Sequence, residues 1–330
     1  MSFSTYRYLL MTVDPVHIGT GGMRLGRVDN SIVREPGTRL PKIPGTSLSG
    51  AVRSYAAYRY GKRDCAGQGA KKDGKEGHCG GAGCPICYTF GSVAGDRAFS
   101  GAISIGDARL LLFPVYSMAG PVWVGTAEIL REAGFKLDGT AGNGSSALTT
   151  MNWSKPLNLG WLMIEKPGRA AIEPPERIKN KPEWNAVAHR IVIVSDKLFT
   201  QIVNSNLEVR TSVSIDPNTG AAEEGALFTY EAIPRGALLW MDVVIDDYQG
   251  KFKPITRQYD SSKGDDQGQE LGASWNTVAD VIGAGLDLAE HLGIGGMGTR
   301  GFGRIRDVDK WQAYPAKEAI KSDAVREAAK

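Results

Sequence analysis

The sequence lacks long apolar runs and carries little net charge. No run of about 18 apolar residues occurs, so we expect no membrane-spanning helix and no membrane partner. The beginning, MSFSTYRYLLMTVDP, has neither a charged leader region nor a long apolar segment, and we therefore expect a cytoplasmic protein without a signal peptide. The net charge is only +3 over 330 residues, which favours a local basic groove over a uniformly basic surface.

The remaining composition is that of an ordinary globular protein. Hydrophobic residues make up 42% of the chain and charged residues 23%, so a chain of this length can bury a sizeable core without disulfides. The length allows one large domain or two ordinary ones. Because no convincing internal repeat is present, we predict a single domain over residues 1–330. The polar segment 247–272 is predicted to be a mobile loop.

Apolar periodicity predicts strands and helices in mixed order. The expected strands lie at 5–14, 101–115 and 190–196, three more lie between 207 and 246, and the last begins near Gly301. The expected helices are 47–60 with Thr46 or Ser47 as N-cap and Gly61 as stop, 196–205 capped by Ser195, 274–293, and 316–330. Because strands and helices do not alternate strictly, this order favours an α+β fold with an antiparallel sheet. We predict a modified ferredoxin-like (RRM-like) core with large insertions, a topology compatible with RNA binding on a sheet face.

One segment is strongly basic. From Arg24 to Arg63 the chain holds nine Lys or Arg residues and only two acids, Asp29 and Glu35. Residues 15–46 contain four prolines and many glycines, which predicts a long ordered loop, and loops of this length usually serve a function or are disordered. A segment this basic indicates a polyanionic partner. Asp29 is then either a turn or salt-bridge residue, or a group that acts on the polyanion.

All four cysteines fall in one window, CAGQGAKKDGKEGHCGGAGCPIC, which begins at Cys65. Such clustering favours a metal site over disulfides in a cytosolic chain. Cys84 and Cys87 form a Cys-x-x-Cys zinc knuckle, Cys79 joins them, and the fourth ligand is either Cys65 or His78. The window is polar and glycine-rich, so a metal would organise it. We predict a structural Zn²⁺ in an insertion over residues 62–90, with idle reduced cysteines as the alternative.

Three stretches carry a family resemblance. They are GRVDNSIVREPGTRLPKIPGTSLSGAVR in the basic segment, DARLLLFPVYSMAGPVWVGT at 107–126, and GIGGMGTRGFGRI at 293–305. Together they resemble the RAMP superfamily, and the second is similar to the repeated backbone subunit of Cmr-type (III-B) CRISPR effector complexes. The cysteine window departs from that pattern and looks more like Csm-type backbone subunits. The subtype therefore stays open, whereas the superfamily does not.

The resemblance implies both an activity and partners. Such a subunit polymerises along a CRISPR RNA guide and cuts the paired target RNA at regular intervals with a divalent metal, Mg²⁺ or Mn²⁺, as part of antiviral defence. The implied partners are the guide, the target RNA, other copies of the chain and other subunits of the type III complex. By motif position, the required aspartate is Asp29. Tyr230 and Glu231 in FTYEAIP resemble a second group of residues near the cut.

The chemistry of the residues gives further candidates. RNA carries its own nucleophile, the 2′-hydroxyl, so an enzyme has to hold the phosphate in line, move a proton and neutralise developing charge. A loop carboxylate such as Asp29 can hold Mg²⁺ or act as a general base. His17 either accepts the 2′-hydroxyl proton, since imidazole titrates near neutral pH, or is hydrogen-bonded within the loop.

The predicted RNA contacts come from the loop, the first helix and the C-terminal glycine-rich loop. A helix N-terminus binds anions, and glycine lets the backbone approach a ligand closely. Met118, among the apolar residues 111–124, is predicted either to press against bases from a protruding hairpin or to pack in the core. The full set of predicted RNA contacts is Arg34, Arg39, Lys42, Ser47, Ser49, Arg53, Gly295, Gly296, Gly298 and Arg300.

Three functions compete for this sequence. The first is a metal-dependent target-RNA endoribonuclease that is also the guide scaffold, and the acid in VDN at 28–30 favours it. The second is a cleavage-inactive guide-binding scaffold in which Asp29 is structural. The third is a CRISPR-RNA processing enzyme with metal-free histidine chemistry, which the presence of only four histidines disfavours.

Overall fold

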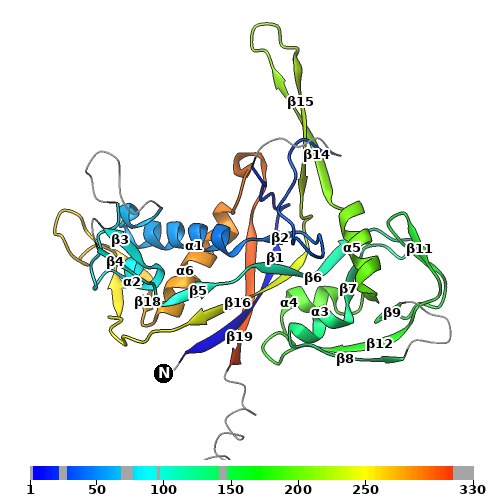
Figure 1. Ribbon diagram of the computed structural model, residues 1–330, viewed down its shortest axis with the longest axis horizontal. Helices are drawn as coiled ribbons and strands as arrows, with labels where there is room; N and C mark the ends of the chain where they lie inside the picture. Colours follow the sequence, from blue (N-terminus) through cyan, green and yellow to red (C-terminus); the bar gives the residue numbers. More distant parts are fainter. Residues whose placement is uncertain (1–2, 22–27, 68–76, 95–96, 141–146, 315–330) are drawn as a thin grey trace, which may run out of the picture.

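The computed structural model describes residues 3–21, 28–67, 77–94, 97–140 and 147–314. Its centre is an antiparallel group of four strands in the order β19-β1-β16-β6 (Figure 1). Tyr8, Leu9 and Leu10 of β1 are all fully buried, with Tyr8 and Leu10 in one core cluster and Leu9 in another, which agrees with the buried strand expected from the sequence. The four strands are β1 (Ser4–Thr12), β6 (Ala108–Val115), β16 (Leu238–Ile245) and β19 (Ile305–Tyr314).

Helices α1 (Gly45–Tyr60) and α6 (Val278–Leu292) pack against each other beside this sheet. They approach so closely that a Cβ added at Gly285 would lie 2.4 Å from the carbonyl oxygen of Val52. Glycine at this position therefore sets the spacing of the two helices.

The N-cap prediction for α1 was wrong. The cap position is Pro44, and no side chain of the neighbouring sequence caps the helix. Instead the Asp107 carboxylate accepts a hydrogen bond of 2.7 Å from the backbone N–H of Gly45. Asp107, which is distant in the sequence, thus accepts the hydrogen bond that a local hydroxyl had been expected to accept. Ser47 lies inside the first turn, and its N–H donates to the Pro44 carbonyl. The stop at Gly61 is confirmed, because Gly61 has a φ of 85°.

The sheet continues beyond β6, and short helices cover it. Ser195 caps α5 as expected, its Oγ accepting a hydrogen bond from the Leu198 N–H. Shorter strands β2 (Lys42–Ile43) and β5 (Ile103–Ile105) pair with β6 and β16, and β10 (Leu157–Leu159) pairs with β11 (Leu162–Ile164). The other elements of this half are β7 (Val122–Thr126), α3 (Ala127–Glu132), β8 (Lys136–Thr140), β9 (Leu148–Thr149), β12 (Gly168–Glu173), α4 (Pro182–Val187), β13 (Ile191–Val194) and α5 (Asp196–Ser205).

A two-stranded hairpin, β14 (Glu208–Ile215) with β15 (Ala222–Ala232), projects from the body of the molecule (Figure 1). The protruding hairpin had been expected at 111–124, and that placement was wrong. Residues 111–115 and 122–124 belong to β6 and β7 inside the large sheet, where Phe113 and Val124 are fully buried. Only the turn between them is exposed, and it includes Met118.

The cysteine window and the segment 247–272 lie at the α1–α6 side of the molecule. The segment contains β17 (Ile255–Arg257), which pairs with β18 (Glu270–Trp275). It is attached to α1, since the Tyr259 N–H donates to the Tyr60 carbonyl at 2.8 Å and the Tyr60 hydroxyl bonds Asp266. Its mobility stays a prediction. The window and the residues next to it form η1 (Arg63–Cys65) and α2 (Pro85–Phe90), and the hairpin of β3 (Ser92–Ala94) and β4 (Arg97–Phe99) follows. The helix expected at 316–330 lies outside the described residues.

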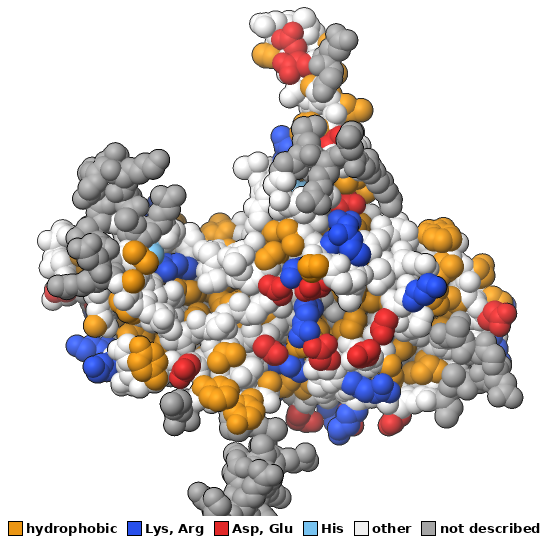
Figure 2. Space-filling model, in the orientation of Figure 1, with side chains coloured by type: hydrophobic (Ala, Val, Ile, Leu, Met, Phe, Trp, Pro, Cys, Tyr) orange, Lys and Arg blue, Asp and Glu red, His pale blue; other side chains and the backbone are white. Residues whose placement is uncertain are grey.

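Figure 2 shows basic and acidic side chains next to one another over the middle of the molecule. Ion pairs of the sheet region include Arg7 with Asp242 and Arg109 with Glu132. Among its described residues, this face therefore carries no continuous basic surface. Whether a basic side chain can bind a polyanion depends on the partners of that side chain. Within the described part of the chain, no helix combines the length and the apolar character that crossing a membrane requires.

Candidate functional site

The lower part of β15 joins the two halves of the loop 15–46. On one side Val16 and Ile233 exchange backbone hydrogen bonds of 2.8 and 2.9 Å. On the other, the Asn30 N–H donates to the Thr229 carbonyl at 3.0 Å, and the Glu231 N–H donates to the Asn30 carbonyl at 3.1 Å. The strand end thus brings the His17 and Asp29 regions of the loop to one place.

Asp29 is held by Thr229. Its Oδ2 accepts hydrogen bonds from the Thr229 backbone N–H at 2.7 Å and from the Thr229 hydroxyl at 2.9 Å. The backbone hydrogen bond, with the hydroxyl second, lowers the pKa of Asp29 below its ordinary value, so the carboxylate is charged at neutral pH. Its other oxygen, Oδ1, accepts no hydrogen bond from the described residues. Among the described residues, the site therefore presents one fixed carboxylate with one oxygen that accepts no hydrogen bond.

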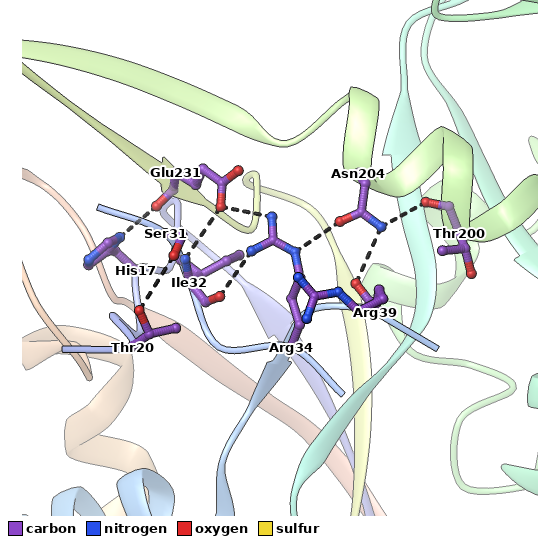
Figure 3. A network of polar contacts seen from close by, with 9 residues as sticks. All are labelled: His17, Thr20, Ser31, Ile32, Arg34, Arg39, Thr200, Asn204 and Glu231. Atoms are coloured by element: carbon purple, nitrogen blue, oxygen red, sulfur yellow. Dashed lines mark hydrogen bonds and ion pairs between the residues drawn. The ribbon is translucent and has the colours of Figure 1, made fainter. Parts of the chain in front are cut away.

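His17 is buried, and its Nδ1 lies 2.6 Å from the backbone carbonyl of Glu231 (Figure 3). A carbonyl only accepts hydrogen bonds, so Nδ1 carries the proton and the neutral ring keeps its lone pair on Nε2. The alternative to a catalytic role was that His17 is hydrogen-bonded within the loop; it is hydrogen-bonded, but to Glu231 of β15. The same hydrogen bond selects the tautomer that a proton acceptor needs.

The C-terminal glycine-rich loop fixes the backbone of His17. The Gly296 N–H donates to the His17 carbonyl at 2.9 Å. Gly295 has a φ of 80°, and a Cβ there would lie 2.4 Å from Cδ1 of Ile18 and 2.5 Å from the His17 carbonyl oxygen. Only glycine fits this close approach. Gly298, by contrast, faces open space, as a position in contact with RNA would.

Glu231 and Arg34 form a buried ion pair of 2.8 Å (Figure 3). The Arg34 Nε also donates to Asn204 Oδ1 at 3.0 Å, and its Nη1 donates to the Ile32 carbonyl at 3.0 Å. Arg34 had been expected to reach a guide phosphate. The structure instead engages every nitrogen of its guanidinium inside the chain, where it ties the loop to α5 and β15.

Tyr230 points to the other side of β15 from Glu231. It is 3% exposed, its hydroxyl lies 3.0 Å from Ser212 Oγ, and its ring packs on Phe302. The ring also meets the edge of His17 at 6.1 Å between centroids. Tyr230 therefore supports His17 from within a small aromatic cluster.

The other predicted basic contacts separate into two groups. Lys42 is paired with Asp107 at 2.5 Å and Glu35 at 3.1 Å, which differs from the expected free phosphate ligand. Arg39 and Arg300 have exposed side chains on the two loops that flank β15. Their guanidinium groups make no ion pair with any described residue, so these two cations are available to a polyanion. Ser49 is half-buried on α1.

Arg53 lies beside the cysteines rather than in the loop. Its Nε donates to the Cys65 carbonyl at 2.7 Å, and burial lowers the pKa of its guanidinium. This placement removes Arg53 from the group of Arg39 and Lys42 with which the sequence had associated it.

The four cysteines come together as predicted. Their sulfur atoms all lie within 4.8 Å of one another, with 3.8 Å between Cys79 and Cys87 and 3.8 Å between Cys84 and Cys65. A tetrahedral ion with metal–sulfur bonds of about 2.3 Å needs sulfurs about 3.8 Å apart. Hydrogen bonding among the four thiols lowers the pKa of Cys79 and Cys87 and raises the pKa of Cys65 and Cys84, so the spacing of the sulfur atoms is what indicates a metal site.

His78 does not belong to this cluster. Its Nδ1 accepts a hydrogen bond of 3.1 Å from the Val93 N–H, and its Nε2 lies 3.0 Å from the Gly67 carbonyl. Both ring nitrogens are thus engaged by the backbone. Of the two alternatives for the fourth ligand, the geometry therefore favours Cys65.

Thr229 and Asn204 were missed in the sequence. The alternation of FTYEA puts Thr229 and Glu231 on one face of a strand, so selecting Glu231 pointed to Thr229 as its neighbour. Nothing local points to Asn204, because its partner Arg34 lies 170 positions away.

Comparison with known proteins identifies the class. The sequence model of the RAMP superfamily matches residues 9–306, and the chain belongs to this superfamily. The Cmr4 endoribonuclease of the CRISPR system Cmr from Pyrococcus furiosus is 29% identical over 258 residues, which are 72% of this chain and 80% of that protein. The Csm3 endoribonuclease of the CRISPR system Cms from Methanothermobacter thermautotrophicus is 38% identical over 88 residues, 26% of this chain and 32% of Csm3.

Solved structures show the same fold. A chain of the type III-B Cmr-beta complex in its apo state, determined by cryo-EM, matches with a TM-score of 0.58 at 14% identity, covering 94% of this chain and 98% of that one. Oligomeric Cmr4 from Pyrococcus furiosus matches with a TM-score of 0.53 at 19% identity, covering 94% and 99%. The predicted resemblance is thereby confirmed: the chain is similar to Cmr4, with a shorter stretch similar to Csm3 and a four-cysteine cluster of its own.

Proposed function

We propose that the chain is a backbone subunit of a type III CRISPR effector complex, which assembles along the guide RNA and cleaves guide-paired target RNA in antiviral defence. Membership of the RAMP superfamily and the endoribonuclease names of its Cmr4 and Csm3 relatives support this proposal. Other copies of the chain and further subunits of the complex are the expected protein partners. The proposed catalytic activity rests on one observation. Thr229 holds the Asp29 carboxylate through Oδ2, while Oδ1 accepts no hydrogen bond from the described residues.

Asp29 is the proposed essential group. Its carboxylate is charged, fixed in direction by Thr229, and oxygen is the ligand type that hard divalent cations prefer. A Mg²⁺ or Mn²⁺ ion held by Asp29 would neutralise charge that develops on the scissile phosphate. Because a single carboxylate makes a weak site, cleavage is expected to be slow and to depend on added metal.

His17 is the proposed proton acceptor for the 2′-hydroxyl of the target. The Nδ1 contact with the Glu231 carbonyl orients the ring and selects the neutral tautomer whose lone pair lies on Nε2. Glu231, Arg34 and Tyr230 then act as positioning residues, since they hold the loop, the strand and the ring in register rather than reaching the RNA themselves.

We propose that the RNA backbone lies along the two flanking loops, where Arg39 and Arg300 supply free positive charge and the glycine-rich loop allows close approach. The four cysteines are proposed to hold one structural Zn²⁺, which organises residues 62–90 and has no part in the chemistry.

We also infer that β1, α1, β6, β16, α6 and β19 form the ferredoxin-like core of a single RAMP domain. Their order along the chain and the antiparallel arrangement β19-β1-β16-β6 support this inference. The cysteine window, the projecting hairpin and the region from β8 to β12 are then insertions into that core.

A cleavage-inactive guide scaffold is the alternative function. The fact that Thr229 satisfies Asp29 Oδ2 with two hydrogen bonds favours it, because a turn residue needs no more than this. The two functions are separated by incubating the assembled complex with guide-paired RNA in the presence of Mg²⁺ or EDTA. Regularly spaced products with Mg²⁺ alone are expected of the enzyme, and intact RNA in both conditions is expected of the scaffold.

A further inference from the structure

A cavity lies beside the cysteine cluster, away from Asp29. Its volume is about 390 Å³, and it opens between α1 and the β3–β4 hairpin. We call it the Arg53–Ser92 pocket; its walls include Arg53, His78, Phe90, Ser92, Phe99 and Gly101. Among the described residues that line it, none is Asp or Glu, and Arg53 is the one Arg or Lys.

Two buried donors of this pocket have no partner among the described residues. They are Nη2 of Arg53 and Oγ of Ser92. The other guanidinium nitrogens of Arg53 are engaged, Nε with the Cys65 carbonyl at 2.7 Å and Nη1 with the Phe90 carbonyl at 3.5 Å. The guanidinium is therefore locked in place with one N–H edge left over. Buried polar groups are normally hydrogen-bonded, and a buried cationic donor without an acceptor is costly.

The same pocket disfavours other uses of these groups. His78 offers nothing to a ligand, because both of its nitrogens are bonded to backbone groups. The Arg53 guanidinium makes no hydrogen bond to any cysteine sulfur, so Nη2 is not spent on the cluster. The guanidinium charge disfavours a cation. The neighbouring cysteine thiolates offset part of that charge, but they leave the N–H edge at Nη2 without an acceptor.

The Arg53 guanidinium and the Ser92 hydroxyl are hydrogen-bond donors of the kinds that bind phosphate groups in proteins. The volume exceeds that of one phosphate group and leaves room for a sugar or base beside Phe90 and Phe99, two aromatic residues that line the pocket. We propose that the Arg53–Ser92 pocket binds a phosphate group, which the proposed function makes a backbone phosphate of RNA, with the attached nucleoside facing the two phenylalanines.

The first test measures binding of inorganic phosphate to the full-length, zinc-loaded chain by phosphorus NMR titration at constant ionic strength. Ser92→Ala removes a hydroxyl that has no partner among the described residues, so the thermal stability of this variant without phosphate is expected to equal that of the wild type. Its phosphate affinity should fall about tenfold, the size of one lost hydrogen bond to a charged acceptor. Ser104→Ala, on the exposed side of β5, is the matched control and should bind as the wild type does.

Arg53→Lys is the second variant, because it keeps the charge and loses the fork. Zinc content is measured alongside, and a weaker phosphate affinity at unchanged zinc content supports the site. Absence of saturable phosphate binding by the wild type, or equal affinity in wild type and Ser92→Ala, would overturn the proposal.

A competition arm identifies the source of the phosphate. A short single-stranded oligouridylate should displace inorganic phosphate from the wild type and bind Ser92→Ala more weakly. Phosphate binding that the oligonucleotide does not displace would overturn the RNA assignment and leave a site for a free phosphate compound. Because Asp29 plays no part in this pocket, cleavage by the assembled complex is scored independently, and the failure of one proposal is distinguishable from failure of the other.

Discussion

Asp29 and Thr229 are joined by three hydrogen bonds, although they lie 200 positions apart in the chain. Two end on Asp29 Oδ2, and the third runs from the Asp29 N–H to the Thr229 hydroxyl at 3.1 Å. A loop and the base of a projecting hairpin are thereby fixed to each other at Asp29, one of the two acids of the basic segment. The proposed chemistry rests on this connection, because it determines where the unused oxygen points.

Removing the Thr229 hydroxyl tests the role of that connection. Thr229→Val keeps the shape and the backbone N–H but loses one donor to Asp29, so we expect cleavage to fall about tenfold or more, as for other residues that orient a metal ligand. The pKa of Asp29 should rise toward its ordinary value. Since the ionised form is the active one, the acid limb of the pH–rate profile should move to higher pH. Thr229→Ser, which retains a hydroxyl, is the control, and identical profiles for all three proteins would contradict this role.

The Arg34–Glu231 pair should matter for stability rather than for RNA affinity. Arg34→Gln leaves a buried carboxylate without its partner, and we expect a loss of about 3 kcal/mol in the free energy of unfolding. Arg39→Gln changes an exposed side chain of the same loop and should leave stability within about 0.5 kcal/mol of the wild type. Urea denaturation of the three proteins measures this. Equal midpoints for Arg34→Gln and wild type would show that the pair contributes nothing.

Arg39 and Arg300 should account for part of the salt dependence of guide binding. Each phosphate contact that is lost lowers the slope of log affinity against log salt by about one. We expect that effect for Arg39→Gln and for Arg300→Gln on two unrelated guide sequences alike. Lys42→Gln is the comparison, because Lys42 is already paired with two carboxylates. A loss confined to one guide sequence would point to base recognition instead.

The cysteine cluster gives a prediction about composition. Cys65→Ser should lose bound zinc and unfold at lower temperature, because it removes one of four thiolates at tetrahedral spacing. His78→Gln should keep one zinc per chain, since the His78 nitrogens face backbone groups. Elemental analysis after washing with a chelator decides the matter. Zinc retained by Cys65→Ser and lost from His78→Gln would reverse the assignment.

Local signals in the sequence were sufficient for most elements of the fold. Ser195 before an apolar helix and Gly61 after one gave boundaries that the structure confirms, because capping and left-handed glycine act within a few residues. The start of α1 was misjudged since its first N–H is bonded by Asp107, 62 positions away. The hairpin was misplaced for a related reason: exposed and buried strands share the same propensities, and tertiary packing decides between them.

In the candidate site, too, local features could be predicted from the sequence, whereas contacts between distant residues could not. The basic segment and the scarcity of acids in it could be predicted from composition, and the cysteine cluster from spacing. The sequence did not predict which of the arginines Arg34, Arg39 and Arg53 is available to bind RNA. They differ in their partners, and the partners are set by the tertiary fold. Their partners are, in that order, a buried glutamate, none in the form of an ion pair within the described chain, and the carbonyl of a cysteine.

The most direct test of the central claim is cleavage of guide-paired RNA by a complex assembled with Asp29→Asn. The asparagine keeps the size of the side chain and an oxygen that can accept from Thr229, but it lacks the charge needed to hold a divalent cation. The account predicts loss of the regularly spaced products in Mg²⁺, with guide binding and assembly unchanged. Regularly spaced products from this complex at the wild-type rate would contradict it and leave Asp29 as a structural residue of a scaffold.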